Sequence, residues 1–210
     1  MKKLLLTLIP VLLLAACTAK KSVVPEGGED DPQGEDTLQP SEDILFLTFK
    51  GESNRTGFTP GASVFNQSCQ NALKALFGTY LDNNEDKGIS GESCAFQYVG
   101  GEATHTTSMT IGSSSYGGNV TFNFNYDIYK VEYKLQNYYK AYSGGYTLDS
   151  GAYLYIEDKK EDLAFTDTTV APPEKTGEYV YTERKKTLTF HNDDGSQRAY
   201  IHELKITFAK

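Results

Sequence analysis

The chain has 210 residues, with 20 basic and 28 acidic side chains, which gives a formal net charge of -8 at pH 7. Electrostatic binding to nucleic acid or to anionic lipid requires a basic face, so this charge argues against both kinds of partner. The chain has no Trp but 15 Tyr and 11 Phe. Aromatic side chains suit a half-buried pleated surface, so this composition favours a β-rich protein.

The N-terminal residues have the pattern of an export signal. Lys2 and Lys3 precede an apolar run from Leu4 to Ala16. This run is shorter than the roughly 20 residues that a membrane-spanning helix requires. A short basic start, a short apolar run and small residues at its end therefore favour a signal peptide over a membrane helix.

The small pair Ala15-Ala16 stands directly before Cys17. This arrangement resembles the lipobox of bacterial lipoproteins. The resemblance implies that residues 1–16 are a lipoprotein signal peptide and that Cys17 becomes the lipidated N-terminus. It also implies that the protein is anchored in the bacterial cell envelope, in the outer leaflet of the cytoplasmic membrane or in the outer membrane.

Residues 17–43 are predicted to be the lipidated cysteine followed by an acidic tether rich in Pro and Gly. The stretch from Pro25 to Asp36 cannot bury enough apolar surface to offset its chain entropy. Its acidic side chains repel one another and extend the chain. We expect the tether to hold a single folded domain, residues 44–210, away from the lipid headgroups.

The folded part is expected to begin with a buried strand and one helix. Residues 44–49 are apolar at every position but one and predict a strand that is buried on both faces. Apolar residues then recur at steps of three and four, which predicts an amphipathic helix near residues 63–81 with Ser63 as its cap. The predicted buried face consists of Phe65, Cys69, Ala72, Leu73, Leu76, Phe77 and Tyr80.

Beyond residue 93 the hydrophobic period changes to two, which indicates β-strands. Val120, Phe122 and Phe124, for example, alternate with Thr121 and Asn123. Short strands separated by polar turns predict an antiparallel β-sandwich or barrel. The expected strands are 94–99, 108–112, 120–126, 128–135, 152–157, 179–182, 187–191 and 199–208.

The order of these strands resembles the galactose-binding-like jelly rolls of bacterial surface proteins. The resemblance covers about residues 101–210. It depends on the long central pair 120–126 and 128–135, with a Gly-rich bend after it, and on the closing strand from Arg198 to Phe208. It implies a jelly-roll-like β-sandwich that binds glycans through loops at one end. Since one fold supports many functions, the function must be argued from a site.

Two cysteines remain if Cys17 is lipidated, namely Cys69 and Cys94. An even pair outside the cytoplasm permits a disulfide. The alternative is two buried thiols that behave as small hydrophobic side chains. The sequence leaves both alternatives open.

The main candidate site is the segment that contains Tyr138, Tyr139, Tyr142 and Tyr146. Gly144 and Gly145 interrupt any alternation that would bury all four rings on one face. We expect at least two of the rings to be exposed and close together, where they could stack on sugars or contact a protein. The alternative is that the rings cover a sheet or pack within a long loop.

Other chemistry is weakly indicated. Asp82, Asn84 and Asp86 place oxygen ligands at alternate residues, as calcium loops do, but a solvated turn explains the segment more simply. No cofactor is predicted beyond this candidate for structural calcium. The sequence has no recognisable nucleophile, phosphate or dinucleotide motif. Two carboxylates for glycoside hydrolysis could stand among the acidic residues, but nothing selects a pair.

The favoured function is therefore a lipid-anchored envelope protein that works as a non-catalytic binding module, with carbohydrate as the expected ligand. One alternative is a structural or adhesion lipoprotein that works through contacts with envelope proteins. The other is a hydrolase with an unrecognised carboxylate site. A shallow aromatic platform is expected of the binding module, and a deep pocket with convergent polar groups is expected of the enzyme.

Overall fold

The computed structural model describes residues 37–52, 65–82, 88–101, 104–195 and 197–210. The predicted signal peptide, Cys17 and most of the predicted tether lie outside the described residues, so the lipid anchor stays a prediction. None of the helices among the described residues is long and apolar enough to cross a membrane.

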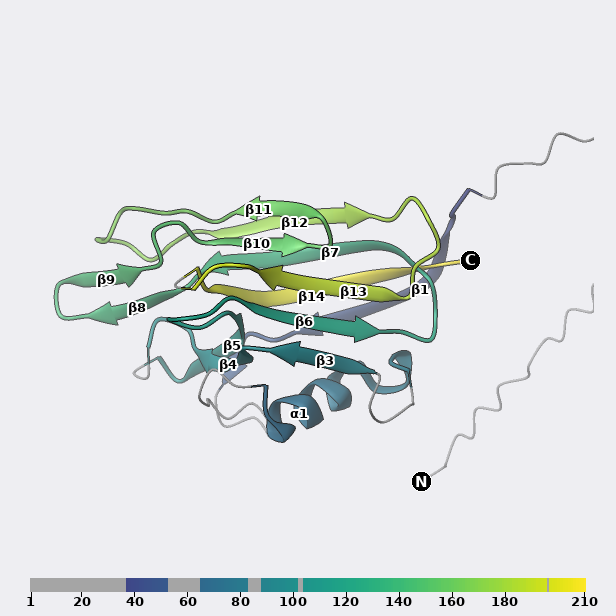
Figure 1. Ribbon diagram of the computed structural model, residues 1–210, viewed down its shortest axis with the longest axis horizontal. Coiled ribbons are helices and arrows are strands. Elements are labelled where there is room, and N and C mark those ends of the chain that lie inside the picture. Colours follow the sequence, from purple (N-terminus) through teal and green to yellow (C-terminus); the bar gives the residue numbers. More distant parts are fainter. Residues whose placement is uncertain (1–36, 53–64, 83–87, 102–103, 196) are drawn as a thin grey trace, which may run out of the picture. The chain divides into compact units, whose positions relative to one another are not determined.

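Two antiparallel sheets pack face to face in a β-sandwich (Figure 1). In the larger sheet the order is β12-β7-β14-β5-β2, β1 also pairs with β14, and β4 also pairs with β5. Its seven strands are β1 (Pro40–Thr48), β2 (Gly51–Glu52), β4 (Cys94–Tyr98), β5 (Thr106–Ile111), β7 (Ile128–Asn137), β12 (Glu174–Val180) and β14 (Ala199–Ala209).

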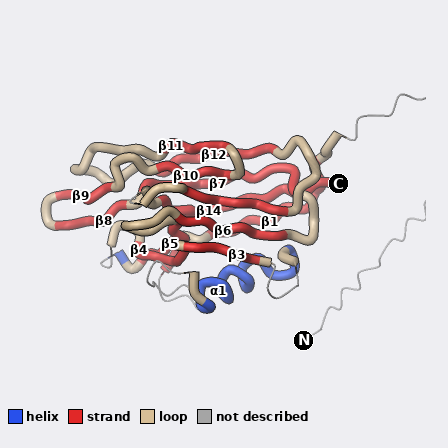
Figure 2. Tube along the Cα trace, viewed as in Figure 1, coloured by secondary structure: helices blue, strands red, loops and turns tan. Residues whose placement is uncertain are grey.

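The smaller sheet has five strands in the order β11-β10-β13-β6-β3, and a separate hairpin extends from one end of the sandwich (Figure 2). The five strands are β3 (Ile89–Glu92), β6 (Gly118–Asn123), β10 (Tyr153–Ile156), β11 (Lys159–Asp162) and β13 (Thr187–Asn192). The hairpin consists of β8 (Tyr139–Tyr142) and β9 (Gly145–Leu148).

The core lies between the two sheets. Alternate residues of each strand point inward, such as Phe122 and Phe190 from the smaller sheet and Leu135 and Ile206 from the larger one, and none of these four side chains is exposed. Each large apolar side chain buried in this way stabilises the fold by about 1.5–3 kcal/mol. The prediction of a mostly β protein with an antiparallel sandwich and one helix is confirmed.

The helix α1 (Gln67–Phe77) is shorter than the predicted segment 63–81. Asn66 is its N-cap, because its side-chain oxygen accepts a hydrogen bond of 2.9 Å from the Cys69 backbone N–H. The α-helix ends at Gly78, whose φ of 55° no longer continues the helix, and a 3₁₀ turn η1 (Gly78–Tyr80) follows. Ser63, the predicted cap, lies outside the described residues.

The predicted buried face of the helix is largely confirmed, since Cys69, Ala72, Leu73 and Phe77 are all buried. The helix contacts β1 of the larger sheet. The ring of Phe77 stacks on that of Phe122 of β6, with 4.5 Å between the ring centroids. The helix therefore covers the core along one side of the sandwich.

The prediction that residues 44–49 form a strand buried on both faces is wrong for one face. Leu47 is buried, but Ile44 and Phe46 are 48% and 60% exposed. Among the described strands β1 pairs only with β14, so it lies at a sheet edge. Its inward residues reach the core, while its other face is left to solvent.

Cys69 of α1 and Cys94 of β4 are two buried free thiols in the structure, and no disulfide joins them. A hydrogen bond with Cys69 and, to a smaller extent, burial raise the pKa of the Cys94 thiol. The two thiols thus pack as hydrogen-bonded small side chains in the core. Their oxidation to a disulfide stays a prediction.

Candidate functional site

The segment with the four tyrosines contains a β-hairpin. β8 and β9 pair in register from Tyr139 opposite Leu148 to Tyr142 opposite Gly145. Tyr142 is 56% exposed, and Tyr138, Tyr139 and Tyr146 are half-buried. None of the four tyrosines is buried, but only Tyr142 is more than half exposed, so the structure separates their roles.

Tyr138 belongs to a packed cluster at the base of the hairpin. The guanidinium carbon of Arg198 lies 3.6 Å from the centroid of its ring, and Tyr200 stacks against the ring at 5.2 Å. Arg198 is held in turn by the buried carboxylate of Asp149, with Nε–Oδ2 and Nη2–Oδ1 distances of 2.8 and 3.0 Å. Arg198 and Tyr200 both pack against the ring of Tyr138, so the role of this ring is structural.

Tyr139 also packs within the protein. Its ring lies edge-on against Tyr146, at a centroid distance of 5.5 Å, and edge-on against Tyr200 at 6.2 Å. A Cβ atom at Gly100 would stand 2.8 Å from Tyr139 Cε2, so glycine is required for the ring to lie there. Burial raises the pKa of Tyr139. The ring of Tyr139 is therefore held by contacts within the protein.

Tyr142 and Tyr146 line an open pocket of about 390 Å³ at the hairpin, which we call the hairpin pocket. The backbone N–H of Tyr146 donates a 2.8 Å hydrogen bond to the carbonyl of Thr168, which ties the hairpin to the opposite wall. Aromatic rings, hydroxyl groups and one Leu form the lining, and it includes no charged side chain. The lining residues are Tyr142, Tyr146, Thr147, Leu148, Ser150, Phe165, Thr166 and Thr168.

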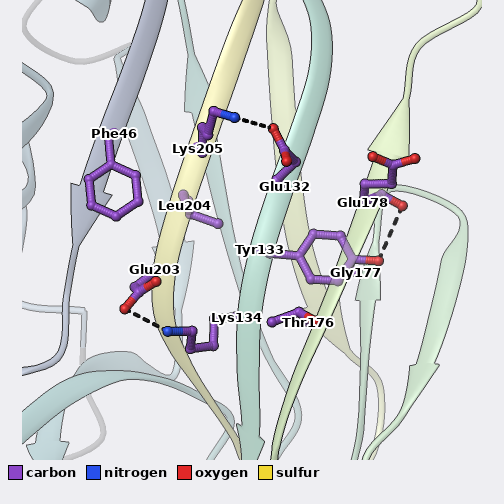
Figure 3. A pocket seen from close by; sticks show the side chains of 10 residues that line it. All are labelled: Phe46, Glu132, Tyr133, Lys134, Thr176, Gly177, Glu178, Glu203, Leu204 and Lys205. Atoms are coloured by element: carbon purple, nitrogen blue, oxygen red, sulfur yellow. Dashed lines mark hydrogen bonds and ion pairs between the residues drawn. The ribbon is translucent and has the colours of Figure 1, made fainter.

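A second hollow, also of about 390 Å³, lies on the outer face of the larger sheet (Figure 3). We call it the sheet-face groove. It has the exposed ring of Phe46 on β1 at one side and Glu178 on β12 at the other. Its lining residues are Phe46, Glu132, Tyr133, Lys134, Thr176, Gly177, Glu178, Glu203, Leu204 and Lys205.

Sequence reasoning missed this groove. The signal was present in part, because Lys130, Glu132 and Lys134 alternate along one strand, and Glu203 and Lys205 do so along another. Alternating opposite charges on two strands are typical of cross-strand ion pairs on one solvent-facing side. What could not be read was that these two strands are neighbours.

The most buried carboxylates are engaged in ion pairs. Asp149 pairs with Arg198, and Glu157, whose side chain is 7% exposed, pairs with Lys185. Glu161, 6% exposed, accepts from Lys175 at 2.7 Å. A buried carboxylate needs such a partner to stay charged, so these contacts account for the burial without a catalytic role.

His202 lies close to a serine, but both residues are fully buried. Its Nδ1 is 2.8 Å from Ser108 Oγ and its Nε2 is 2.8 Å from Gln136 Oε1. Burial lowers the pKa of His202 to about 3, so the imidazole is neutral. The contacts join β14, β5 and β7. Because no side chain of the trio is exposed, the arrangement is a structural network.

The calcium hypothesis cannot be followed through the structure, because Asn84 and Asp86 lie outside the described residues, although Asp82 lies within them. In the part of the chain that is described, no group of three or more His, Cys, Asp or Glu residues could hold a metal ion. The candidate calcium site stays a sequence prediction.

No protein-family model matches the chain, and no curated protein sequence matches it. Two similar solved structures are variants of a family 29 carbohydrate binding module. One has 17% sequence identity and a TM-score of 0.29, and the similarity covers 60% of this chain and 86% of the module. The other has 16% identity and a TM-score of 0.29, with 61% and 88% covered. The fold described above is established from the strands and core of this chain itself.

Proposed function

We propose that this protein is a non-catalytic carbohydrate-binding module of the bacterial cell envelope, anchored by a lipid on Cys17, and that it binds glycan in the hairpin pocket. The observation that carries this proposal is the lining of that pocket. Two Tyr rings and one Phe ring stand beside four Thr and Ser hydroxyl groups, and no charged side chain is among them.

This combination fits the chemistry of a sugar. A pyranose ring has apolar C–H faces that pack on an aromatic ring, while its hydroxyls need hydrogen-bond partners around the rim. Tyr142 supplies an exposed ring. The hydroxyls of Thr147, Ser150 and Thr166 supply donors and acceptors at the same opening. A neutral lining suits a neutral ligand, because it imposes no cost of burying an unpaired charge.

Binding is favoured over hydrolysis by the same lining. Glycoside hydrolysis generally uses two carboxyl groups that flank the scissile bond. The hairpin pocket has no Asp, Glu or His in its lining. The buried carboxylates Asp149 and Glu161 lie elsewhere in ion pairs with Arg198 and Lys175.

The sequence at the N-terminus supports the envelope location. Lipid chains contribute about 0.8 kcal/mol per buried CH₂, so more than one chain on Cys17 would make a stable anchor. The acidic tether would then carry the sandwich clear of the headgroups. In this arrangement the hairpin pocket could meet polysaccharide outside the membrane.

The test is a saccharide array probed with the full chain, followed by affinity measurements on two variants. Tyr142→Ala should weaken binding by about 1–2 kcal/mol, because it removes the exposed ring from the pocket. Tyr116→Ala is the matched control, since Tyr116 is 73% exposed and is not part of the pocket lining. The melting temperature should hardly change in either variant.

The proposal would be contradicted if the protein bound no glycan on the array. Equal affinities of the wild type and Tyr142→Ala would also contradict it. A pull-down from envelope extract separates the adhesion alternative. Capture of an envelope protein that is lost in Tyr142→Ala, without any glycan binding, would favour protein contacts at the same pocket.

A further inference from the structure

We propose that the sheet-face groove is a second binding surface, and that it takes an uncharged oligosaccharide lying across β12, β7, β14 and β1. The proposed function supplies only the class of ligand. The surface itself is argued from the register, charge and exposure of the residues that form it.

Register places the groove residues in rows that cross four strands. Glu178 is opposite Glu132, Glu132 is opposite Lys205, and Lys205 is opposite Phe46. Neighbouring strands lie about 4.8 Å apart, so a row from β12 to β1 spans about 14 Å. A ligand that follows such a row is therefore extended and lies across the strands.

The charges in the groove are paired within the face. Lys134 Nζ lies 2.8 Å from Glu203 Oε1, and Lys205 Nζ lies 2.9 Å from Glu132 Oε2. Figure 3 shows both pairs lying between Phe46 and Glu178. Glu178 is paired in turn with Lys130 at 3.3 Å, just beyond the groove.

These six charged groups sum to zero, although the chain as a whole has a net charge of -8. A charged ligand would find no opposite net charge here. Each ammonium still has three N–H donors and each carboxylate has several lone pairs, of which the ion pairs use only some. The remaining donors and acceptors can bind the hydroxyl groups of a neutral sugar.

Phe46 supplies the apolar contact. This side chain is 60% exposed and lines the groove. Covering a large apolar side chain removes its surface from water, which favours binding. If one sugar ring packs on Phe46, the next sugars of the chain can form hydrogen bonds with Lys205 and Glu132 on the next two strands. This ordering of an aromatic group followed by paired charges fits a polyhydroxylated chain better than an apolar peptide.

The test uses the full chain in affinity gel electrophoresis against neutral polysaccharides, namely dextran, starch, mannan, galactan and xylan. Dextran sulfate is the charged counterpart of dextran. Phe46→Ala should weaken binding to the preferred neutral polysaccharide by about tenfold. The matched control is Ile44→Ala, which changes a side chain on the same strand that is 48% exposed but is not part of the groove lining. Added NaCl should change the affinity little, because an uncharged ligand is not screened.

The two variants separate the two surfaces. If Phe46→Ala binds like the wild type while Tyr142→Ala loses affinity, the second surface is refuted and the hairpin pocket stands. If Phe46→Ala loses affinity and Tyr142→Ala does not, the sheet-face groove stands and the hairpin pocket is refuted. Stronger binding to dextran sulfate than to any neutral polymer would overturn the proposal that the ligand is uncharged. Retardation by none of the polymers would overturn both surfaces.

Discussion

Tyr133 packs directly beneath Gly177. The two residues are opposite each other on β7 and β12, and a Cβ atom at position 177 would stand 2.6 Å from Tyr133 Cε2. The ring passes through the space that a side chain at 177 would fill. Its hydroxyl then donates a 2.5 Å hydrogen bond to Glu161 of β11, which belongs to the other sheet. This contact joins β7, the second strand of the larger sheet, to β11, the edge strand of the smaller sheet.

Gly177→Ala should therefore destabilise the protein by about 1–3 kcal/mol, the usual cost of adding a methyl group to a packed site. Chemical denaturation with urea measures the change in the free energy of unfolding. Thr176→Ala, on the adjacent exposed position of the same strand, should have a much smaller effect. Equal stability of Gly177→Ala and the wild type would show that Tyr133 can move away freely.

Glu161 should make stability depend on pH in the acid range. Burial acts to raise the pKa of Glu161, but hydrogen bonds from Lys175, Tyr133 and Lys159 outweigh it and lower the pKa to about 2. A lowered pKa means that the stabilisation is present above the unfolded value of 4.5 and is lost as the pH falls from there to about 2. The loss should amount to roughly 3 kcal/mol.

Urea denaturation at several pH values between neutral and strongly acidic conditions tests this expectation. Glu161→Gln should be less stable than the wild type at neutral pH, and its stability should fall less steeply in acid, because the titrating group is gone. Parallel pH profiles for the two proteins would show that Glu161 does not control acid unfolding.

The two core cysteines should resist alkylation in the native protein. Both are buried, and the raised pKa of Cys94 makes its reactive thiolate scarce. Mass spectrometry after iodoacetamide treatment, with and without urea, measures the accessible thiols. Labelling of Cys94 without urea would contradict the packing.

The same labelling tests the disulfide that the sequence permits. In exported protein unfolded in urea without reductant, two labelled core cysteines indicate free thiols and no label indicates a Cys69–Cys94 bridge. A bridge would stabilise the protein by about 3 kcal/mol, so its reduction should lower the melting temperature by several degrees.

Cys17→Ser should abolish lipidation and leave the protein unprocessed or released from the membrane. The reason is that the lipid is attached through the cysteine sulfur, which serine lacks. Mass spectrometry of the purified protein and fractionation of the cells measure the two effects. An unchanged mass and unchanged membrane association in the variant would refute the predicted anchor.

Local periodicity made part of the fold predictable. The helix face around Leu73 and Phe77 follows from steps of three and four residues, and β6 follows from the alternation of Val120 and Phe122. The short strands β3 and β11 were not predicted, because these polar segments form strands through pairing with β6 and β10. Their own side chains have little hydrophobic pattern.

The candidate sites were predictable only where they are local. The Tyr-rich segment could be identified from residues close together in sequence, but the division between the packed Tyr138 and the open Tyr142 depends on Arg198 and Tyr200. The sheet-face groove combines Phe46 with residues more than eighty positions away. Without the order of the strands, no sequence pattern could connect them.

The position of β14 in the chain sets the order in which the larger sheet can assemble. Thr48 of β1 pairs with Glu203, and Ile44 pairs with Thr207, so these partners are about 160 residues apart. Pairing across such a separation is slow, because a long loop must close before any contact is gained. During synthesis or passage through a membrane, β1 therefore cannot pair with β14 until nearly all of the described chain has emerged. The strand that follows the predicted tether is among the first to leave the ribosome and among the last to be fixed.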